Sequence, residues 1–237
     1  MKLKLYYIYV GTLLLLACSP SYTLQSHEDK VVAIQASADS TALAIIAPYQ
    51  NAIEEEMQEV LTFTKTELNK KGAESTLGNF VTDLCLNYAD AHMCVMNNGG
   101  LRTTINKGNI TRGKLYELMP FENELVVLKL NKEDYLGLLN YICKRGGEPF
   151  SGISITMKED GGIINYSQPV DFSKGEKVKV LTSDYLANGG DKMSFFQDKE
   201  QIKVGLKLRD AIIDYCSKTD TINVQLDGRL KIIENGK

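Results

Sequence analysis

Residues 186–191 read "LANGGD" and follow a stretch of β-favouring residues, "KVKVLTSDY", at 177–185. Two glycines after a strand allow a backbone conformation with positive φ, or the close approach of another group. Tyr185 precedes the acid of this stretch, Asp191, by six residues. An aromatic ring and a carboxylate on one turn can bind a planar ring and a sugar hydroxyl. The alternative is a strand-ending turn with a solvated Asp191, because Asn-Gly and Gly-Asp are common turn formers.

A second glycine-containing loop carries an arginine. The sequence "NGGLR" ends at Arg102 and follows a short apolar stretch, "MCVMNN", at 93–98. A guanidinium just beyond a strand end can present two parallel N–H groups to a phosphate or a carboxylate. The alternative for Arg102 is an ordinary surface ion pair.

A third turn, "PFEN" at 120–123, places Phe121 and Asn123 next to a rigid proline. Phe121 and Tyr185 can stack on the two faces of a planar ring, while Asp191 accepts hydrogen bonds from a sugar hydroxyl or a ring amine. The alternative for both aromatic residues is a place in the hydrophobic core. Taken singly, each of these residues favours its structural alternative; the turns indicate a binding site only when they are taken together.

The sequence lacks the residues of the common hydrolytic centres. It contains two histidines, His27 and His92. Two-metal phosphatases need several histidines and carboxylates to hold ions about 3.5–4 Å apart. A Gly-x-Ser-x-Gly motif, a P-loop and a dinucleotide-binding fingerprint are also absent from the sequence. We therefore predict a binding site with no catalytic residue, no metal and no cofactor in this chain.

The elements that position these turns follow from apolar periodicity, caps and breakers. Helical spacing predicts helices over 41–61, 74–92, 110–121, 131–145 and 206–218. Pro48 divides the first of these, and the part after Pro48 has the stronger helical pattern, because proline is tolerated in the first turn of a helix. The expected helix caps are Ser75 or Thr76, Thr111 and Asn131. Strands are predicted at 93–98, 123–130, 177–183 and 228–234, with a hairpin of 150–158 and 162–168 around "EDGG". Interspersed helices and hairpins indicate an α+β fold, a mixed β-sheet with helices packed on it.

The first residues have the pattern of an export signal. Lys2 and Lys4 precede an apolar run and small residues before Cys18. The ending "LLAC" resembles the bacterial lipobox, in which the cysteine carries the lipid; a plain signal peptide is the alternative. We expect a signal peptide at 1–17, a lipidated tether at 18–40 with a first strand at 31–35, and a folded domain at 41–237. This organisation places the protein in the cell envelope, anchored to a membrane by lipid.

Charge and cysteine usage narrow the partners. Removing residues 1–17 takes away two of the 27 basic residues, Lys2 and Lys4, and leaves 25 against 30 acidic ones, a net charge of −5. This balance argues against a nucleic-acid partner. The remaining cysteines form no Cys-x-x-Cys pair. A buried thiol is expected for Cys85 and Cys143, although an oxidising envelope also permits a disulfide.

An ordered set of short motifs resembles the C-terminal domain of the 5′-nucleotidase family. The set comprises "ES-LGN---D", "N-GG-R", "PF-N", "SG", "LTSDYLANGGD" and "RDAIIDY...DGR". The motifs span roughly residues 50 to 235 and occur in the family's order. Each motif is short, but their joint occurrence at suitable spacing is specific.

The resemblance implies a nucleotide- or nucleoside-binding site. Asn97 and Arg102 match the residues near the ribose and the phosphate. Phe121 matches the aromatic residue that stacks on the base, and Asn123 the residue that reaches the base edge.

The remaining matches complete the implied site. Tyr185 matches the second stacking residue, where the family usually has phenylalanine, and Asp191 the acid that binds the ribose hydroxyls. Gly152 matches the glycine of the pocket wall.

Three positions depart from the family pattern. Asn98 stands where the family usually has glycine, and Lys192 replaces the glycine after "GGD". Lys71 matches a phosphate-binding arginine, and lysine keeps the charge but loses the two-pronged geometry. These departures put the phosphate half of the site in more doubt than the base and ribose half.

The resemblance also implies a hydrolase, yet the family's metal-binding catalytic domain has no counterpart in this sequence. Our leading hypothesis is that this chain is the substrate-specificity half of a two-chain nucleotidase in nucleotide catabolism. A separate metallophosphoesterase chain would then supply the divalent metals. The main alternative is an independent nucleoside- or nucleotide-binding lipoprotein without hydrolytic function. A third hypothesis is an assembly module with a vestigial site.

Overall fold

The computed structural model describes residues 39–234. The predicted signal peptide, Cys18, nearly all of the tether and the strand expected at 31–35 lie outside the described residues. The first helix, α2 (Ser40–Gln58), begins after Asp39, whose side chain accepts hydrogen bonds from the backbone N–H groups of Thr41 and Ala42. Pro48 therefore lies inside a continuous helix and does not begin a new one, which corrects the sequence prediction.

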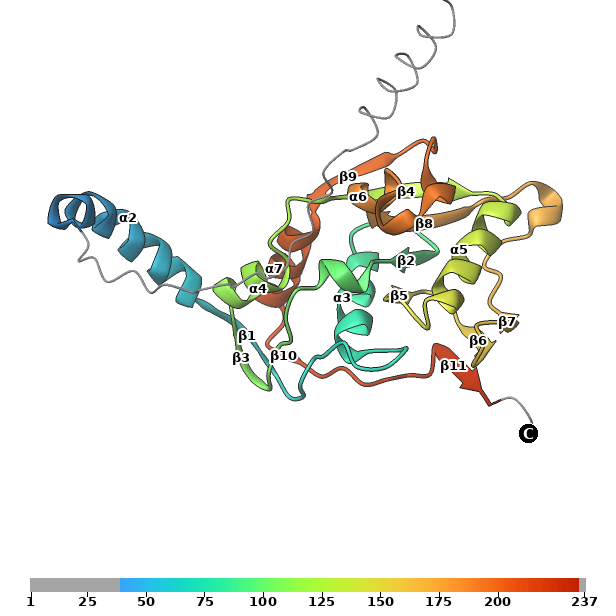
Figure 1. Cartoon of the computed structure of the whole chain (residues 1–237), viewed down its shortest axis with the longest axis horizontal. Coiled ribbons are helices and arrows are strands. Elements are labelled where there is room, and N and C mark those ends of the chain that lie inside the picture. Colours follow the sequence, from blue (N-terminus) through green and yellow to red (C-terminus); the bar gives the residue numbers. More distant parts are fainter. Residues whose placement is uncertain (1–38, 235–237) are drawn as a thin grey trace, which may run out of the picture. The chain divides into compact units, whose positions relative to one another are not determined.

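The other helices and strands of the described range are interspersed along the chain (Figure 1). The α-helices after α2 are α3 (Thr76–Leu86), α4 (Arg112–Leu118), α5 (Lys132–Lys144), α6 (Asp184–Ala187) and α7 (Leu208–Lys218). Single 3₁₀ turns occur at η1 (Asn98–Gly100), η2 (Phe172–Lys174), η3 (Gly190–Lys192) and η4 (Ser194–Phe196). The strands are β1 (Val60–Thr64), β2 (Met93–Val95), β3 (Gly108–Thr111), β4 (Glu124–Leu130), β5 (Phe150–Ser151), β6 (Ile155–Lys158), β7 (Ile163–Tyr166), β8 (Val178–Ser183), β9 (Ile202–Lys207), β10 (Thr221–Ile222) and β11 (Leu230–Ile233).

The strands form three small sheets, two of which flank a central one. The central sheet has the order β5-β2-β8-β4-β9, and the others are β10-β1-β3 and β11-β6-β7. Parallel pairs (β2 with β8) and antiparallel pairs (β4 with β8 and β9) occur together in the central sheet. The predicted α+β fold with a mixed sheet and packed helices is confirmed.

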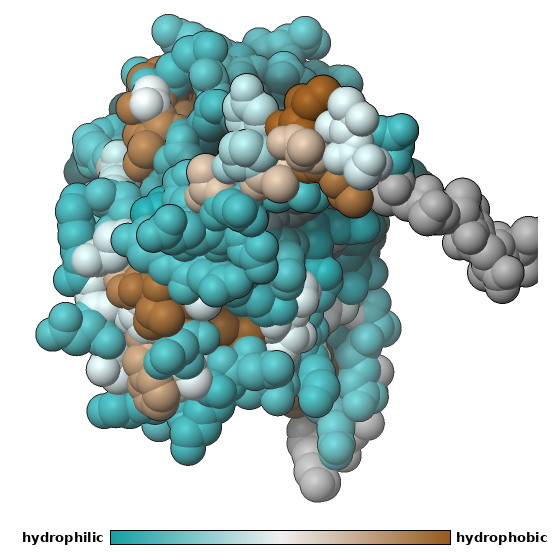
Figure 2. Space-filling model, turned by 90° about the vertical axis from the view of Figure 1, so that its left-hand side faces the viewer, coloured by the Kyte–Doolittle hydropathy of each residue, from teal (hydrophilic) through white to brown (hydrophobic). Residues whose placement is uncertain are grey.

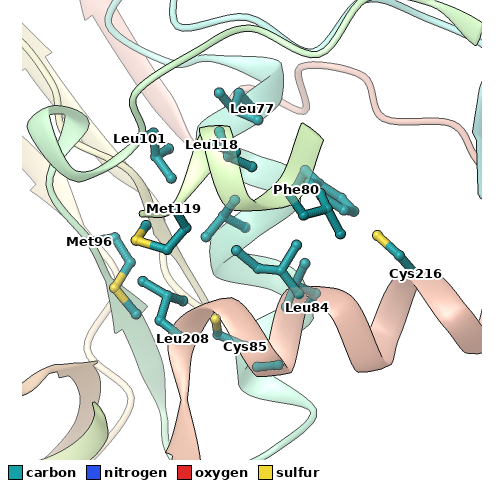
Figure 3. Close-up of a cluster of buried hydrophobic side chains, with 14 of the residues drawn as sticks. Leu77, Phe80, Leu84, Cys85, Met96, Leu101, Leu118, Met119, Leu208 and Cys216 are labelled. Atoms are coloured by element: carbon teal, nitrogen blue, oxygen red, sulfur yellow. The ribbon is translucent and has the colours of Figure 1, made fainter. Parts of the chain in front are cut away.

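Alternation along β4 divides the interior into two cores. Leu125 and Val127 face a core that includes α3, α4 and α7, whereas Val126 and Leu128 face a core that includes α5. Figure 3 shows part of the first core, where Leu84 of α3 lies close to the helix that carries Cys216. The central sheet is therefore covered on both faces, and its strand ends hold the turns that carry the predicted site residues.

Local capping explains where three of the helices begin. Ser75, Thr111 and Asn131 each accept a hydrogen bond from the backbone N–H three residues ahead, at Gly78, Lys114 and Asp134 respectively. These are the caps expected from the sequence, with Ser75 chosen over Thr76. The hairpin of β6 and β7 is also confirmed, although the predicted first strand is interrupted at Gly152.

All four cysteines of the described range are buried and unpaired: Cys85, Cys94, Cys143 and Cys216. The buried thiols expected for Cys85 and Cys143 are confirmed. Burial raises the pKa of Cys216 to about 12 and that of Cys143 above its ordinary value.

The described surface is largely hydrophilic on the face drawn in Figure 2, with apolar residues in small separate groups. From residue 39 to residue 234, no helix combines the length and the apolarity needed to cross a membrane.

Candidate functional site

One cavity of about 300 Å³ collects residues from three loops that are far apart in the sequence. Six of the predicted site residues line it together with two glycines: Asn97, Gly99, Gly100, Arg102, Phe121, Asn123, Tyr185 and Asp191. The loops follow β2, precede β4 and follow β8, which are strands of the central sheet. The sheet therefore brings the three predicted turns to one place.

A lysine outside the cavity lining holds the backbone of the first loop, residues 97–102. The Nζ atom of Lys70 donates to the carbonyl oxygen of Leu101 at 2.6 Å and lies 3.4 Å from that of Asn98. A Cβ atom at Gly100 would lie 2.8 Å from Oδ1 of Asn97, so a larger residue there would displace the Asn97 amide. The Nη1 atom of Arg102 donates to the carbonyl oxygen of Gly99 at 3.1 Å, and most of its guanidinium donors stay available.

The second loop carries Phe121 and is held by a buried arginine of α7. Arg209 is 6% exposed, and its Nη1 atom donates to the carbonyl oxygens of Met119 and Phe121 at 3.3 and 3.4 Å. Its other end pairs with Glu122. The Phe121 ring lies 6.0 Å from Cζ of Arg102 and keeps 41% of its surface exposed. A large aromatic side chain is thus presented to the cavity and not to the core.

The third loop explains the glycine pair of "LANGGD". Gly189 has a φ of +86°, a conformation that side chains disfavour. At Gly190 a Cβ atom would lie 2.5 Å from the ring of Tyr185, so only glycine lets the ring lie against the loop. Tyr185 is 44% exposed, which places it at the cavity surface and excludes the core alternative.

Asp191 connects the third loop to the first. Its Oδ2 atom accepts a hydrogen bond from Nδ2 of Asn97 at 2.5 Å, and its Oδ1 atom accepts one from the Tyr185 hydroxyl at 3.1 Å. The same hydroxyl accepts from the backbone N–H of Asp191 at 3.2 Å. Asp191 therefore organises the cavity and is not a free solvated acid.

The side-chain amide of Asn123 contrasts with Asp191, whose carboxylate is already hydrogen-bonded. Its backbone carbonyl accepts from the N–H of Leu208 at 2.9 Å, which fixes the turn. Within the described part of the chain its side chain has no hydrogen-bond partner. The cavity thus offers one free amide, two exposed aromatic rings and a guanidinium to a ligand.

Gly152 and the three positions that depart from the family pattern are not among the residues that line the cavity. Gly152 has a φ of +85°, and a Cβ atom there would lie 2.3 Å from the carbonyl oxygen of His92, so the close passage of β2 explains this glycine. Gly152, Asn98 and Lys192 do not line the cavity. Lys71 has 85% of its side chain exposed and lies 3.9 Å from Glu67. Among the described residues that line the cavity, Arg102 is the one cation, and Lys71 is not part of the lining.

The described residues hold no group of three or more histidine, cysteine or carboxylate side chains arranged to bind a metal ion. Nδ1 of His92 accepts from the backbone N–H of Lys179 at 2.9 Å. His92 therefore supports the junction of β2 and β8.

The sequence pattern gave no sign of the residues that hold the loops from behind, such as Lys70 and Arg209. The motif "RDAIIDY" does include Arg209, but the contact with the Phe121 turn spans 88 residues. Only the folded chain shows which loop this arginine supports.

A family profile described as "5′-nucleotidase, C-terminal domain" matches residues 54–198. The chain belongs to this family. The match begins within α2 and includes all three loops of the cavity. The family resemblance stated from the motifs is therefore confirmed.

Known relatives of this 5′-nucleotidase C-terminal domain are longer proteins. An apyrase of Tabanus yao is 26% identical over 222 residues, which cover 78% of this chain and 40% of the relative. A 5′-nucleotidase of Vibrio cholerae is 26% identical over 137 residues, which cover 54% of this chain and 25% of the relative. The chain thus spans less than half the length of these relatives.

A solved structure confirms the fold relationship. The 5′-nucleotidase precursor from Thermus thermophilus superimposes with a TM-score of 0.68 at 26% identity, over 83% of this chain and 44% of that one. The NAD nucleotidase of Haemophilus influenzae gives a TM-score of 0.65 at 19% identity, which shows the fold alone.

Proposed function

We propose that this 5′-nucleotidase C-terminal domain binds a nucleotide or nucleoside and acts as the substrate-specificity half of a two-chain nucleotidase. One observation carries the binding proposal: the two exposed aromatic rings, the guanidinium and the acid of three distant loops line a single cavity of about 300 Å³. Ligand pockets of about this size combine apolar walls with a few fixed polar groups.

The chemistry of the lining matches the parts of a nucleotide. Phe121 and Tyr185 offer faces for stacking on a base, and the free amide of Asn123 can reach its edge. Asp191 with Asn97 offers acceptor and amide groups to ribose hydroxyls. Arg102 supplies the only guanidinium of the lining to a phosphate.

The hydrolytic step is proposed to come from another chain. The sequence supplies two histidines, too few for a two-metal phosphatase centre. A metallophosphoesterase chain would supply the divalent metals and the attacking water, and the interface would bury about 1,200–2,000 Å² in total. Lipidation of Cys18 would hold the complex at a membrane of the cell envelope, a proposal supported by the "LLAC" pattern.

An independent nucleoside- or nucleotide-binding lipoprotein is the second candidate. The same cavity supports it, because the cavity is formed by this chain alone. The two candidates differ in whether a partner phosphatase gains activity when this chain is added.

The deciding experiment is a calorimetric titration of the purified chain with adenosine and with AMP, without metal. We expect binding that falls sharply in Asp191→Ala, because this change removes the group that joins Asn97 to Tyr185. Absence of binding at millimolar ligand would contradict a site that is complete in the isolated chain.

The two-chain proposal has its own test. The chain is mixed with a metallophosphoesterase encoded in the same genome, and phosphate release from AMP is measured. Activity that exceeds that of either chain alone supports the specificity-half proposal. Nucleotide binding without any gain in activity would favour the independent binding lipoprotein.

A further inference from the structure

The end of α5 contacts the third loop of the cavity. The hydroxyl of Tyr141 donates a hydrogen bond to the backbone carbonyl oxygen of Asp191 at 2.7 Å, across 50 residues of sequence. Tyr141 does not line the cavity. Burial raises the pKa of its hydroxyl above the ordinary value, so the group stays a proton donor throughout the neutral range.

A buried acid just after α5 contacts the first loop. Glu148 is 3% exposed, and its Oε2 atom accepts a hydrogen bond from the backbone N–H of Asn98 at 2.8 Å. Its Oε1 atom accepts from Nε of Arg145 at 2.5 Å. A buried carboxylate is costly unless it is paired and hydrogen-bonded, and here both oxygens have partners.

Arg145 joins these two contacts into one cluster. Its Cζ atom lies 5.5 Å from the centroid of the Tyr141 ring, while its Nε atom pairs with Glu148. The cluster of Tyr141, Arg145 and Glu148 thus lies behind the cavity and contacts the backbone of two of its three loops.

Each of the two loops has a backbone feature that these contacts stabilise. Asp191 has a φ of +50° and Lys192 a φ of +66°, in the left-handed region that residues other than glycine rarely adopt. Asn98 begins the 3₁₀ turn η1, and its neighbour Asn97 has no side-chain capping bond. The hydrogen bond from Glu148 fixes the orientation of this turn from outside it.

We propose that the Tyr141–Arg145–Glu148 cluster positions the two glycine loops so that Asn97 and Asp191 meet in a ligand-ready arrangement. This inference rests on the proposed function for its consequence in binding. The effect of the cluster on the two loops can be measured without a ligand. In this arrangement Tyr141 and Glu148 are positioning residues, because neither lines the cavity.

The chain contains a matched control on the same helix. Tyr135 is fully buried, and its hydroxyl also donates to a backbone carbonyl, that of Ser167, at 2.6 Å. Ser167 follows β7 and does not line the cavity. Tyr135→Phe and Tyr141→Phe therefore remove the same chemical group from α5, and only the second change affects a loop of the cavity.

The test begins with hydrogen–deuterium exchange of the full ligand-free chain, followed by mass spectrometry. In Tyr141→Phe we expect exchange to rise about two- to tenfold in the peptide that covers 186–193, the factor that corresponds to one lost hydrogen bond. Tyr135→Phe leaves this peptide unchanged. Equal exchange in the two variants would overturn the proposal.

Glu148 is tested by rescue. Glu148→Met removes the acceptor for the N–H of Asn98 and raises exchange in the peptide that covers 97–102. Glu148→Gln keeps an amide oxygen for this N–H, so we expect protection close to that of the unmodified chain. A Gln variant that exchanges like the Met variant would contradict the positioning role of this hydrogen bond. If the Met variant does not fold, the comparison of Tyr141→Phe with Tyr135→Phe still decides.

Calorimetry with AMP then separates the inference from the proposed function. We expect Tyr141→Phe to weaken AMP binding about two- to tenfold and Tyr135→Phe to leave it unchanged. If the unmodified chain binds AMP and the two variants bind equally well, the positioning role in binding is refuted. If the unmodified chain does not bind AMP, but loop exchange responds as expected, the proposed function fails and the positioning role stands.

Discussion

Truncation of Phe121 separates a ligand-binding role from a structural one. The ring lines the cavity with 41% of its surface exposed, and its turn is held by the backbone contacts of Arg209. Phe121→Ala therefore removes the ring without removing the groups that fix the turn. We expect weaker nucleotide binding and a modest loss of stability.

The magnitudes follow from exposure and stacking. Full burial of a phenylalanine contributes about 1.5–3 kcal/mol, so a ring that is somewhat more than half buried loses roughly 1–2 kcal/mol of folding free energy on truncation. Stacking of one base on an aromatic ring contributes about 1–3 kcal/mol. The dissociation constant for AMP should accordingly rise about 5- to 150-fold.

Phe63 of β1 is a matched control. It is 38% exposed, close to the value for Phe121, and it does not line the cavity. Phe63→Ala should therefore lower the melting temperature by a similar amount and leave the dissociation constant unchanged. Calorimetric titration and thermal unfolding of both variants provide the two measurements.

The reasoning is refuted if the unmodified chain binds AMP and Phe121→Ala binds it within twofold as tightly. Equal weakening of AMP binding in Phe63→Ala would also refute it, because binding would then follow stability and not stacking.

Three further predictions concern Gly190 in the third loop, the stability at acid pH, and the Cys216 thiol. Gly190→Ala should weaken AMP binding and lower the melting temperature, because its Cβ atom would lie 2.5 Å from the Tyr185 ring; unchanged binding would show that the ring does not rest on this loop. Lys207 and Arg209 lower the pKa of Glu122 from 4.5 to about 2 in the folded chain. This contribution to stability is present above pH 4.5 and is lost as the pH falls toward 2. Glu122→Gln should thus have a lower melting temperature than the unmodified chain at pH 6. Near pH 2.5 the two melting temperatures should be nearly equal. Burial raises the pKa of the Cys216 thiol to about 12, so at pH 8 this thiol should react with a thiol reagent only after unfolding. Peptide mapping of the treated protein provides the measurement. A label on Cys216 in the folded protein would contradict its burial.

Local signals in the sequence were sufficient for part of the fold. Helices α3, α4 and α5 combine apolar residues at helical spacing with a side chain that caps the backbone N–H three residues ahead. Both signals are local, so the starts of these helices could be predicted. The strands β1, β9 and β10 could not, because they are short or half exposed and owe their pairing to distant partners. Pro48 was misleading, because the Asp39 cap begins the helix upstream of it.

The candidate site divides in the same way. Six lining residues could be named because three turns beside strands match, in order, the motifs of the 5′-nucleotidase C-terminal domain. The supporting residues could not, because nothing local distinguishes Tyr141 or Glu148 from other residues of α5 and its end. Their contacts each bridge 50 residues and exist only once the helix packs against the sheet.

The hydrogen bonds of Asp191 have a consequence for any ligand that reaches it. Both carboxylate oxygens already accept a hydrogen bond, one from Asn97 and one from Tyr185. A carboxylate has about four acceptor sites, so a ligand hydroxyl can add a hydrogen bond to these two or replace one of them. A ligand that displaces these donors without a hydroxyl of its own leaves a desolvated charge unpaired. Under the proposed function, Asp191 therefore discriminates against a ligand that displaces these donors and offers no hydrogen-bond donor in exchange.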